Sequence, residues 1–148
     1  MVIGQQEQVS EELLSARFTI DPDRLAARGR SLQLLLLHRR CAGCWGTIIQ
    51  EPGGGMAIDV DEHLERIANH CSLSPEFIQS DMPSMEAAFR VLLSNGRKPM
   101  TLQAIYETLR ERWSNPTNPR TPPPDKLYRM LLADTFYGIT QLAEVKGK

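Results

Sequence analysis

From Ser84 onward, apolar residues recur with the spacing of two successive helices. Ser84 can cap the start of the first helix, and Asn95-Gly96 is suited to end it. Pro99 blocks any continuation, and Thr101 can cap a second helix. Each helix has one apolar face: Met85, Ala88, Phe89, Leu92 and Leu93 in the first, and Leu102, Ile105, Tyr106, Leu109 and Trp113 in the second.

The pattern changes twice more before the end of the chain. Residues 114–123 hold four prolines and two asparagines, which predicts a loop. A third helix is expected from Pro124, and a strand with a break at Gly138 is expected after it. The apolar residues of this part are Leu127, Met130 and Leu131 in the helix and Phe136, Tyr137 and Ile139 in the strand. Three short helices followed by a strand are the order of a winged helix-turn-helix domain, expected over residues 84–148.

This part of the chain also resembles a known family. The family pattern is a helix of small apolar residues, then Lys-Pro with a following Ser or Thr, then a second helix rich in Ile and Leu. The matching positions are Ala87, Ala88, Val91, Leu92, Lys98, Pro99, Thr101 and Ile105, and the closing FYGI matches the wing strand. The stretch thus resembles the HARE-type winged helix of chromatin-associated proteins and is similar to the N-terminal domain of the bacterial RNA polymerase delta subunit. The resemblance implies a winged helix associated with DNA or a transcription-type protein complex.

The first 80 residues predict a separate helical region. Expected there are an amphipathic helix over 5–18, a helix from Asp21-Pro22 through Gly29 to Leu37, a short strand at 47–49, a glycine turn at 51–55 and a helix over 59–71. Residues 72–83 are expected to be a linker. The fold class is therefore mainly α: an N-terminal helical region with a small Cys/His metal-type knuckle over 1–80, followed by the winged helix over 84–148.

Cysteine and histidine spacing gives the most specific chemical pattern. Cys41 and Cys44 are separated by two residues, which lets two thiolates face one metal ion, and Cys71 supplies a third sulfur. His70 is the preferred fourth ligand of a structural zinc site, with His38 and His63 as alternatives. Other hypotheses remain open: an iron–sulfur cluster, a redox-active C-x-x-C pair, or a buried Cys71 beside two ordinary thiols.

Charge is divided unevenly along the chain. The net charge is only −1, but residues 1–80 hold 7 basic and 11 acidic side chains, whereas residues 81–148 hold 10 and 7. The excess of positive charge lies in the predicted winged helix, the sign that a nucleic-acid surface requires. The candidate contacts with nucleic acid are Arg97, Lys98, Arg120, Lys126, Tyr128 and Arg129. The alternative partner is protein alone, with the chain acting as a zinc-stabilised adaptor.

Several other classes of function are not expected. The sequence has no nucleophile elbow, P-loop, H-E-x-x-H or other catalytic motif, so we expect neither an enzyme nor a small-molecule substrate. No apolar run reaches the length of a membrane span, and the first residues lack the pattern of a secretory signal. We therefore expect a cytoplasmic protein without membrane contact.

Overall fold

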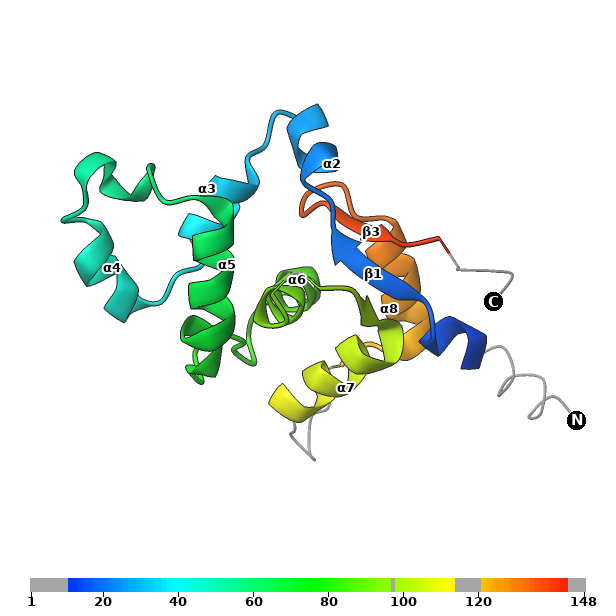
Figure 1. The fold of residues 1–148 in the computed structure, drawn as a ribbon. Coiled ribbons are helices and arrows are strands. Elements are labelled where there is room, and N and C mark those ends of the chain that lie inside the picture. The colour runs from blue at the N-terminus through cyan, green and yellow to red at the C-terminus, as the bar shows by residue number, and fades with distance from the viewer. Residues whose placement is uncertain (1–10, 97, 114–120, 144–148) are drawn as a thin grey trace, which may run out of the picture.

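The computed structural model describes residues 11–96, 98–113 and 121–143, and it is mainly helical with one small sheet (Figure 1). Its mainly helical character confirms that part of the sequence prediction. The elements are β1 (Arg17–Ile20), α2 (Pro22–Ala27), α3 (Leu32–Leu37), α4 (Ala42–Ile48), the 3-10 turn η1 (Pro52–Gly55), α5 (Val60–Asn69), the 3-10 turn η2 (Cys71–Leu73), α6 (Ser84–Ser94), β2 (Met100–Thr101), α7 (Leu102–Arg112), α8 (Pro124–Leu132) and β3 (Ile139–Gln141).

The sheet has the order β2-β1-β3, and both pairings are antiparallel. Its central strand comes from the N-terminal part, with Phe18 opposite Met100 on one side and Gln141 on the other. The helix expected to run through Phe18 is wrong from Arg17 onward, because Phe18 and Ile20 alternate into the core with period two. Residues 5–10 of that expected helix lie outside the described residues.

Gly29 divides the next predicted helix into two. Asp21 caps α2 as expected, with its Oδ1 accepting from the Asp23 N–H at 3.0 Å. The chain then takes a φ of +72° at Gly29, a conformation that ends helices and that glycine adopts without strain. Ser31 starts α3, its Oγ accepting from the Leu34 N–H at 3.3 Å. The single helix predicted from Asp21 to Leu37 is therefore wrong.

A helix replaces the short strand predicted at 47–49. Cys44 and Ile48 lie four residues apart on the buried face of α4, and this packing overrides the strand preference of Thr47 and Ile48. The glycine turn follows as expected. A Cβ on Gly55 would lie 2.7 Å from Ile48 Cγ2, so the chain passes too close to α4 for a larger residue there.

Helices α7 and α8 agree with their predicted starts, but the predicted cap of α6 is wrong, because Pro83 is its N-cap and Ser84 is already its first residue. The last strand begins later than predicted. Thr101 caps α7 through the Ala104 N–H at 3.1 Å, and α8 begins at Pro124. Phe136 and Tyr137 do not belong to β3, because their N–H groups donate to the Asp134 carboxylate at 3.0 Å rather than to a strand. Within the described residues, no helix combines the length and apolar character needed to cross a membrane.

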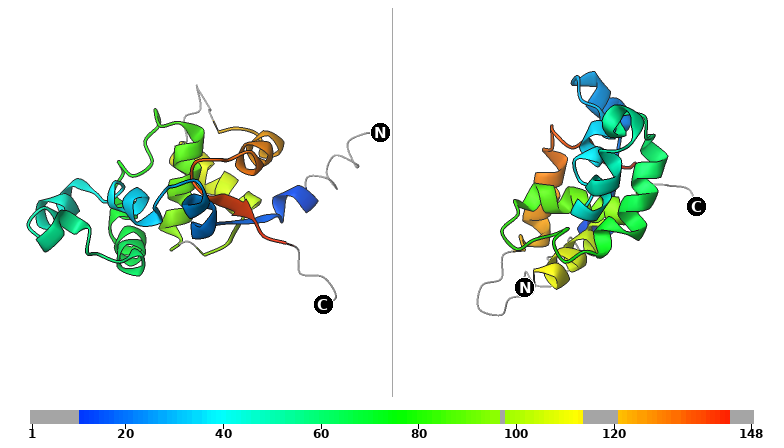
Figure 2. Two further views of the ribbon diagram at one scale, coloured as in Figure 1. Left: turned by 90° about the horizontal axis from the view of Figure 1, so that it is seen from above. Right: turned by 90° about the vertical axis from the view of Figure 1, so that its left-hand side faces the viewer.

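The two predicted parts are packed around one connected core. In Figures 1 and 2, α4 and η1 lie at one end of the molecule, α8 and the sheet lie toward the other, and α6 lies between them. The core draws side chains from both parts. The segment expected to be a linker also contributes to it, with Phe77 and Ile78 only 4% and 3% exposed. β1 also joins the two parts, because it lies before the boundary predicted between residues 80 and 84 and pairs with β2 and β3, which lie after it.

Candidate metal centre

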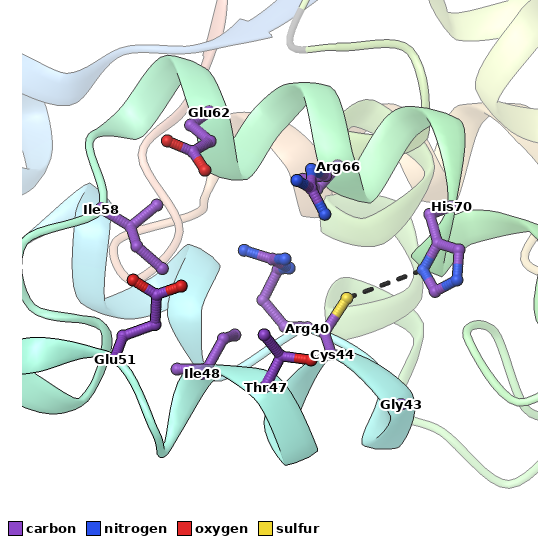
Figure 3. Close-up of a pocket in the computed structure, with 10 residues that line it drawn as sticks. All are labelled: Arg40, Gly43, Cys44, Thr47, Ile48, Glu51, Ile58, Glu62, Arg66 and His70. Carbon is purple, nitrogen blue, oxygen red and sulfur yellow. Dashed lines mark hydrogen bonds between the residues drawn. The ribbon is translucent and has the colours of Figure 1, made fainter.

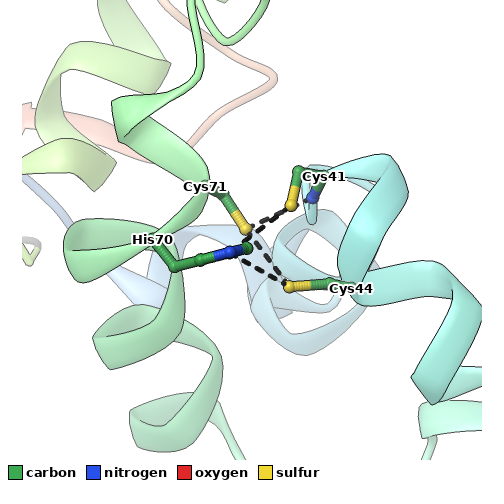
Figure 4. A group of neighbouring side chains, drawn as sticks. All are labelled: Cys41, Cys44, His70 and Cys71. Carbon is green, nitrogen blue, oxygen red and sulfur yellow. Dashed lines mark hydrogen bonds between the residues drawn. The ribbon is translucent and has the colours of Figure 1, made fainter.

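Two of the four candidate ligands come from the start of α4. Cys41 occupies the N-cap position, and Cys44 lies three residues later, so both sulfurs are on one side of the first turn (Figure 4). Cys41 is half-buried, and Cys44 is 8% exposed. The structure thus places this pair at a helix start.

The other two ligands come from the end of α5. Adjacent helical side chains diverge by about 100°, so a regular helix would not let His70 and Cys71 reach one point. His70 leaves the helical conformation, with φ −136° and ψ −63°, and Cys71 begins the 3-10 turn η2. Both side chains therefore face α4 (Figure 4). Cys71 is fully buried, and His70 is exposed.

Three of the distances between the candidate ligand atoms are compatible with a tetrahedral zinc ion. Zinc binds sulfur at about 2.3 Å and nitrogen at about 2.0–2.1 Å, so a regular tetrahedron has edges of about 3.8 Å between sulfurs and about 3.5–3.6 Å between sulfur and nitrogen. Cys44 Sγ lies 3.7 Å from Cys71 Sγ. His70 Nδ1 lies 3.5 Å from Cys41 Sγ and 3.6 Å from Cys44 Sγ. The four ligand atoms lie within 4.8 Å of one another, close enough to hold one metal ion.

The structure distinguishes His70 from the two alternative histidines. His38 is exposed at the end of α3 and is not part of the cluster. His63 is fully buried, and its Nδ1 lies 2.9 Å from Arg40 Nη1. A guanidinium can only donate, so Nδ1 accepts and the imidazole is neutral. Burial and the charge of Arg40 both lower the pKa of His63.

Arg40 is the main electrostatic feature beside the sulfurs. It is 8% exposed, and among the described residues no carboxylate lies within ion-pair distance of it. Burial raises the pKa of the Cys44 thiol, but hydrogen bonds from Arg40 and the other two cysteines bring that pKa down to about 7. Burial raises the pKa of the Cys71 thiol to about 11, although Cys71 Sγ accepts the Cys41 N–H at 3.2 Å. A metal ion would therefore displace a proton from Cys71.

A cavity of about 310 Å³ lies between α4 and α5 next to the ligands (Figure 3). The Arg40 guanidinium and the Cys44 sulfur point toward it, with Glu51 and Glu62 at the end away from His70. Its walls thus carry both signs of charge and are not selective for an anion. The lining residues are Arg40, Gly43, Cys44, Thr47, Ile48, Glu51, Ile58, Glu62, Arg66 and His70.

The residues predicted to contact nucleic acid are only partly brought together. Lys126 and Arg129 are exposed and three residues apart on α8. Tyr128 is half-buried, and its hydroxyl lies 3.1 Å from Gln141 Oε1, so it supports β3 as well. Lys98 is exposed before β2. Arg97 and Arg120 lie outside the described residues.

Sequence reasoning missed the buried charges around the metal centre. Arg39, Arg40 and Glu86 are buried or nearly so, although arginine and glutamate are usually exposed. The one available signal was the pair of arginines directly before Cys41. It could not show where those side chains point.

Comparison with known proteins adds no family to this description. No family model, no curated protein and no solved structure matches the chain. Any function must therefore be proposed from the chemistry of the four ligands and from the surface of the C-terminal helices.

Proposed function

We propose that the protein holds one zinc ion and that its C-terminal helices form a winged helix that binds nucleic acid. The zinc proposal depends on one observation: three distances among the ligand atoms match the edges of a zinc tetrahedron. An iron–sulfur cluster fits less well. Its ligands bind different iron atoms and lie farther apart than ligands of a single ion.

Charge balance supports the zinc proposal independently. Three thiolates and a neutral imidazole around Zn²⁺ give a net charge of −1. Arg40 supplies the compensating positive charge from a buried position against Cys44. This accounts for a guanidinium that would otherwise be costly to bury without a carboxylate. With four protein ligands, zinc would have a structural role, because no open position remains for a substrate.

The arrangement of the C-terminal elements supports the winged-helix proposal. The short strand β2 lies between α6 and α7, and β3 follows α8, which is the order of elements in that fold. β1 occupies the position between β2 and β3. In a winged helix the third helix reads the major groove, and here that helix is α8.

The exposed positive charge on α8 supports nucleic acid as the partner. Lys126 and Arg129 project into solvent from one face of the helix. Asp125 lies 3.6 Å from Arg129, but both side chains are 68% exposed. Such an exposed pair is worth little and can yield to a phosphate. Arg97, Lys98 and Arg120 complete the proposed contact set.

An adaptor that binds protein is the second candidate, and one observation favours it. The end of α8 and the turn after it expose apolar surface, with Leu132 47% and Phe136 38% exposed. The Arg30 guanidinium lies 3.9 Å from the centre of the Phe136 ring. Aromatic residues and arginine are enriched at protein interfaces.

Elemental analysis of purified protein tests the metal. The expected result is one zinc per chain, with the zinc lost in Cys44→Ser. A cobalt-substituted sample should show the intense visible absorption of tetrahedral cobalt bound to thiolates. Iron with a brown chromophore would replace the zinc proposal by an iron–sulfur protein.

A salt-dependent binding assay on a generic DNA duplex separates the two partner classes. Phosphate contacts release counterions, so the affinity should fall steeply as salt rises. Lys126→Ala and Arg129→Ala should each weaken binding, whereas Arg66→Ala removes the same charge from α5 and should not. Equal effects of all three variants, or no binding at low salt, would favour the protein adaptor.

A further inference from the structure

Both sides of the metal centre are connected to one turn of α6. On the Cys41 side, Arg39 donates to Glu86, from Nε at 2.9 Å and from Nη2 at 2.8 Å. On the Cys71 side, Arg90 Nη1 donates to the Phe77 carbonyl at 3.0 Å. Arg90 Nε also donates to Glu86, at 2.8 Å. Glu86 and Arg90 are four residues apart, so the two connections meet on one face of α6.

Side chains at the end of α7 also bind the segment that follows Cys71. Arg112 Nη2 donates to the carbonyl of Ser72 at 3.0 Å, directly after the ligand. Trp113 Nε1 donates to the carbonyl of Gln79 at 2.8 Å. A displacement of Cys71 would therefore act on α6 and α7 through three separate hydrogen bonds to the 72–79 backbone.

From Glu86 the connection continues to the start of β3. The Tyr137 hydroxyl donates to Glu86 Oε1 at 2.9 Å. The backbone of Tyr137 is held by Asp134, whose carboxylate accepts from the N–H groups of Phe136, Tyr137 and Ile139. This turn joins α8 to β3. The Glu86 carboxylate therefore links the metal centre to the part of the fold that carries the proposed binding surface.

The contacts around Glu86 require one defined arrangement of the side chains. The side chains of Arg39, Glu86 and Arg90 are only 11%, 14% and 20% exposed. One carboxylate accepts from two guanidinium groups and one phenol, and hydrogen bonds between charged groups depend strongly on geometry. In contrast, Cys41 is half-buried and His70 is exposed, so the metal position can be reached from solvent.

We propose that the protein is metal-responsive: binding of a thiophilic divalent ion such as zinc fixes Arg39 and the 72–79 segment, and thereby fixes α6 and the α8–β3 turn. The ion binds best when its four ligands converge, which is the state in which Arg39 reaches Glu86. Because the ion binds this state more tightly than states in which the ligands lie apart, it shifts the population of molecules toward it. This inference rests on the proposed metal site but not on nucleic-acid binding.

Amide hydrogen exchange with and without zinc tests the proposal on the full chain. The regions compared are 84–94 and 134–139, which are the proposed targets, and 41–73, which surrounds the site. Glu86→Gln is the test variant. Glu107→Gln is the matched control, because it makes the same change on α7, where Glu107 is exposed and accepts from Gln103 at 3.1 Å.

Zinc should slow exchange in all three regions of the wild type and of Glu107→Gln, with an effect on 84–94 on the order of tenfold. In Glu86→Gln zinc should still protect 41–73, but its effect on 84–94 should be smaller and its effect on 134–139 should be lost, because the Arg90 contact with the Phe77 carbonyl remains while the Tyr137 contact with the carboxylate is gone. An undiminished response of 84–94 in Glu86→Gln would overturn the proposal. Protection of the wild type that is confined to 41–73 would also overturn it. The same holds if the whole chain, α7 and α8 included, is unfolded without zinc. Absence of bound zinc would instead refute the proposed metal site, and binding stoichiometry identifies that case.

Discussion

Arg39 and Glu86 form a two-point ion pair, with Nε–Oε2 at 2.9 Å and Nη2–Oε1 at 2.8 Å. Arg39 lies two residues before Cys41, and Glu86 lies in the first turn of α6. The pair is a direct side-chain link between the Cys/His knuckle and the C-terminal helices. Its geometry makes it sensitive to small changes at either end.

Glu86→Gln should destabilise the protein by roughly 2–4 kcal/mol, because two nearly buried guanidinium groups lose their charged partner. Burial raises the pKa of Glu86, but hydrogen bonds from Arg39 and Arg90 outweigh it and lower that pKa. The stabilisation is therefore present above the usual glutamate pKa of about 4.3 and is lost as the pH falls below it. Urea unfolding across this range measures the difference between wild type and variant. A difference that does not shrink in acid would contradict the ion-pair account.

Tyr137→Phe should change how the stability of the protein depends on pH in alkaline solution. Burial and the charge of Glu86 raise the pKa of Tyr137 to about 12. Because the unfolded value is about 10, the stabilisation is complete below that pH and is lost as the pH rises toward 12. The variant should lack this alkaline loss and should be about 1–2 kcal/mol less stable at neutral pH. Chemical unfolding at both pH values, with tyrosinate absorbance as a second readout, checks the prediction.

Arg40→Gln should weaken zinc binding without removing a ligand. The variant removes the positive charge that lies against Cys44, and changes beside metal ligands typically cost about 10–100-fold in affinity. Arg66→Gln is the control, because Arg66 lines the same cavity but is exposed. Competition with a chromogenic chelator measures both affinities. Equal affinities in the two variants would show that Arg40 does not balance the charge of the site.

Phe18→Ala should destabilise the C-terminal helices as well as the N-terminal strand. Phe18 is fully buried and packs edge-on to Tyr128 of α8, with ring centres 6.0 Å apart. Removing a buried phenylalanine side chain costs about 3–5 kcal/mol. Arg17→Ala, on the exposed face of β1, should have little effect. Thermal unfolding of both variants makes the comparison, and similar losses would argue against the central position of β1.

Local signals allowed the sequence to predict several helix starts and the residues of the Cys/His cluster. Asp21, Thr101 and Pro124 act through neighbours within three residues, so their roles are visible in a short window. The Cys41 and Cys44 spacing is local in the same sense. His70 and Cys71 were also identified, although the bend that turns both toward α4 could not be predicted.

Contacts between distant parts of the chain could not be read in this way. Phe18 fits the predicted helix as well as a strand pattern, and its pairing with Met100 and Gln141 decided the outcome. The buried positions of Arg39 and Glu86 likewise depend on each other. A charged side chain is normally predicted to be exposed, and only the tertiary fold shows that these two are nearly buried.

The placement of β1 in the middle of the sheet sets the order in which parts of the chain can fold during synthesis on the ribosome. The four residues of the Cys/His cluster lie between residues 41 and 71, so the knuckle can assemble while the C-terminal helices are still untranslated. β1 emerges earlier still, yet both of its edges stay unpaired until β2 and then β3 leave the exit tunnel. An unpaired strand rich in buried residues is prone to misassociation. A nascent chain would thus carry an assembled Cys/His cluster while β1 is still unpaired, and β3 would be the last strand to join the sheet.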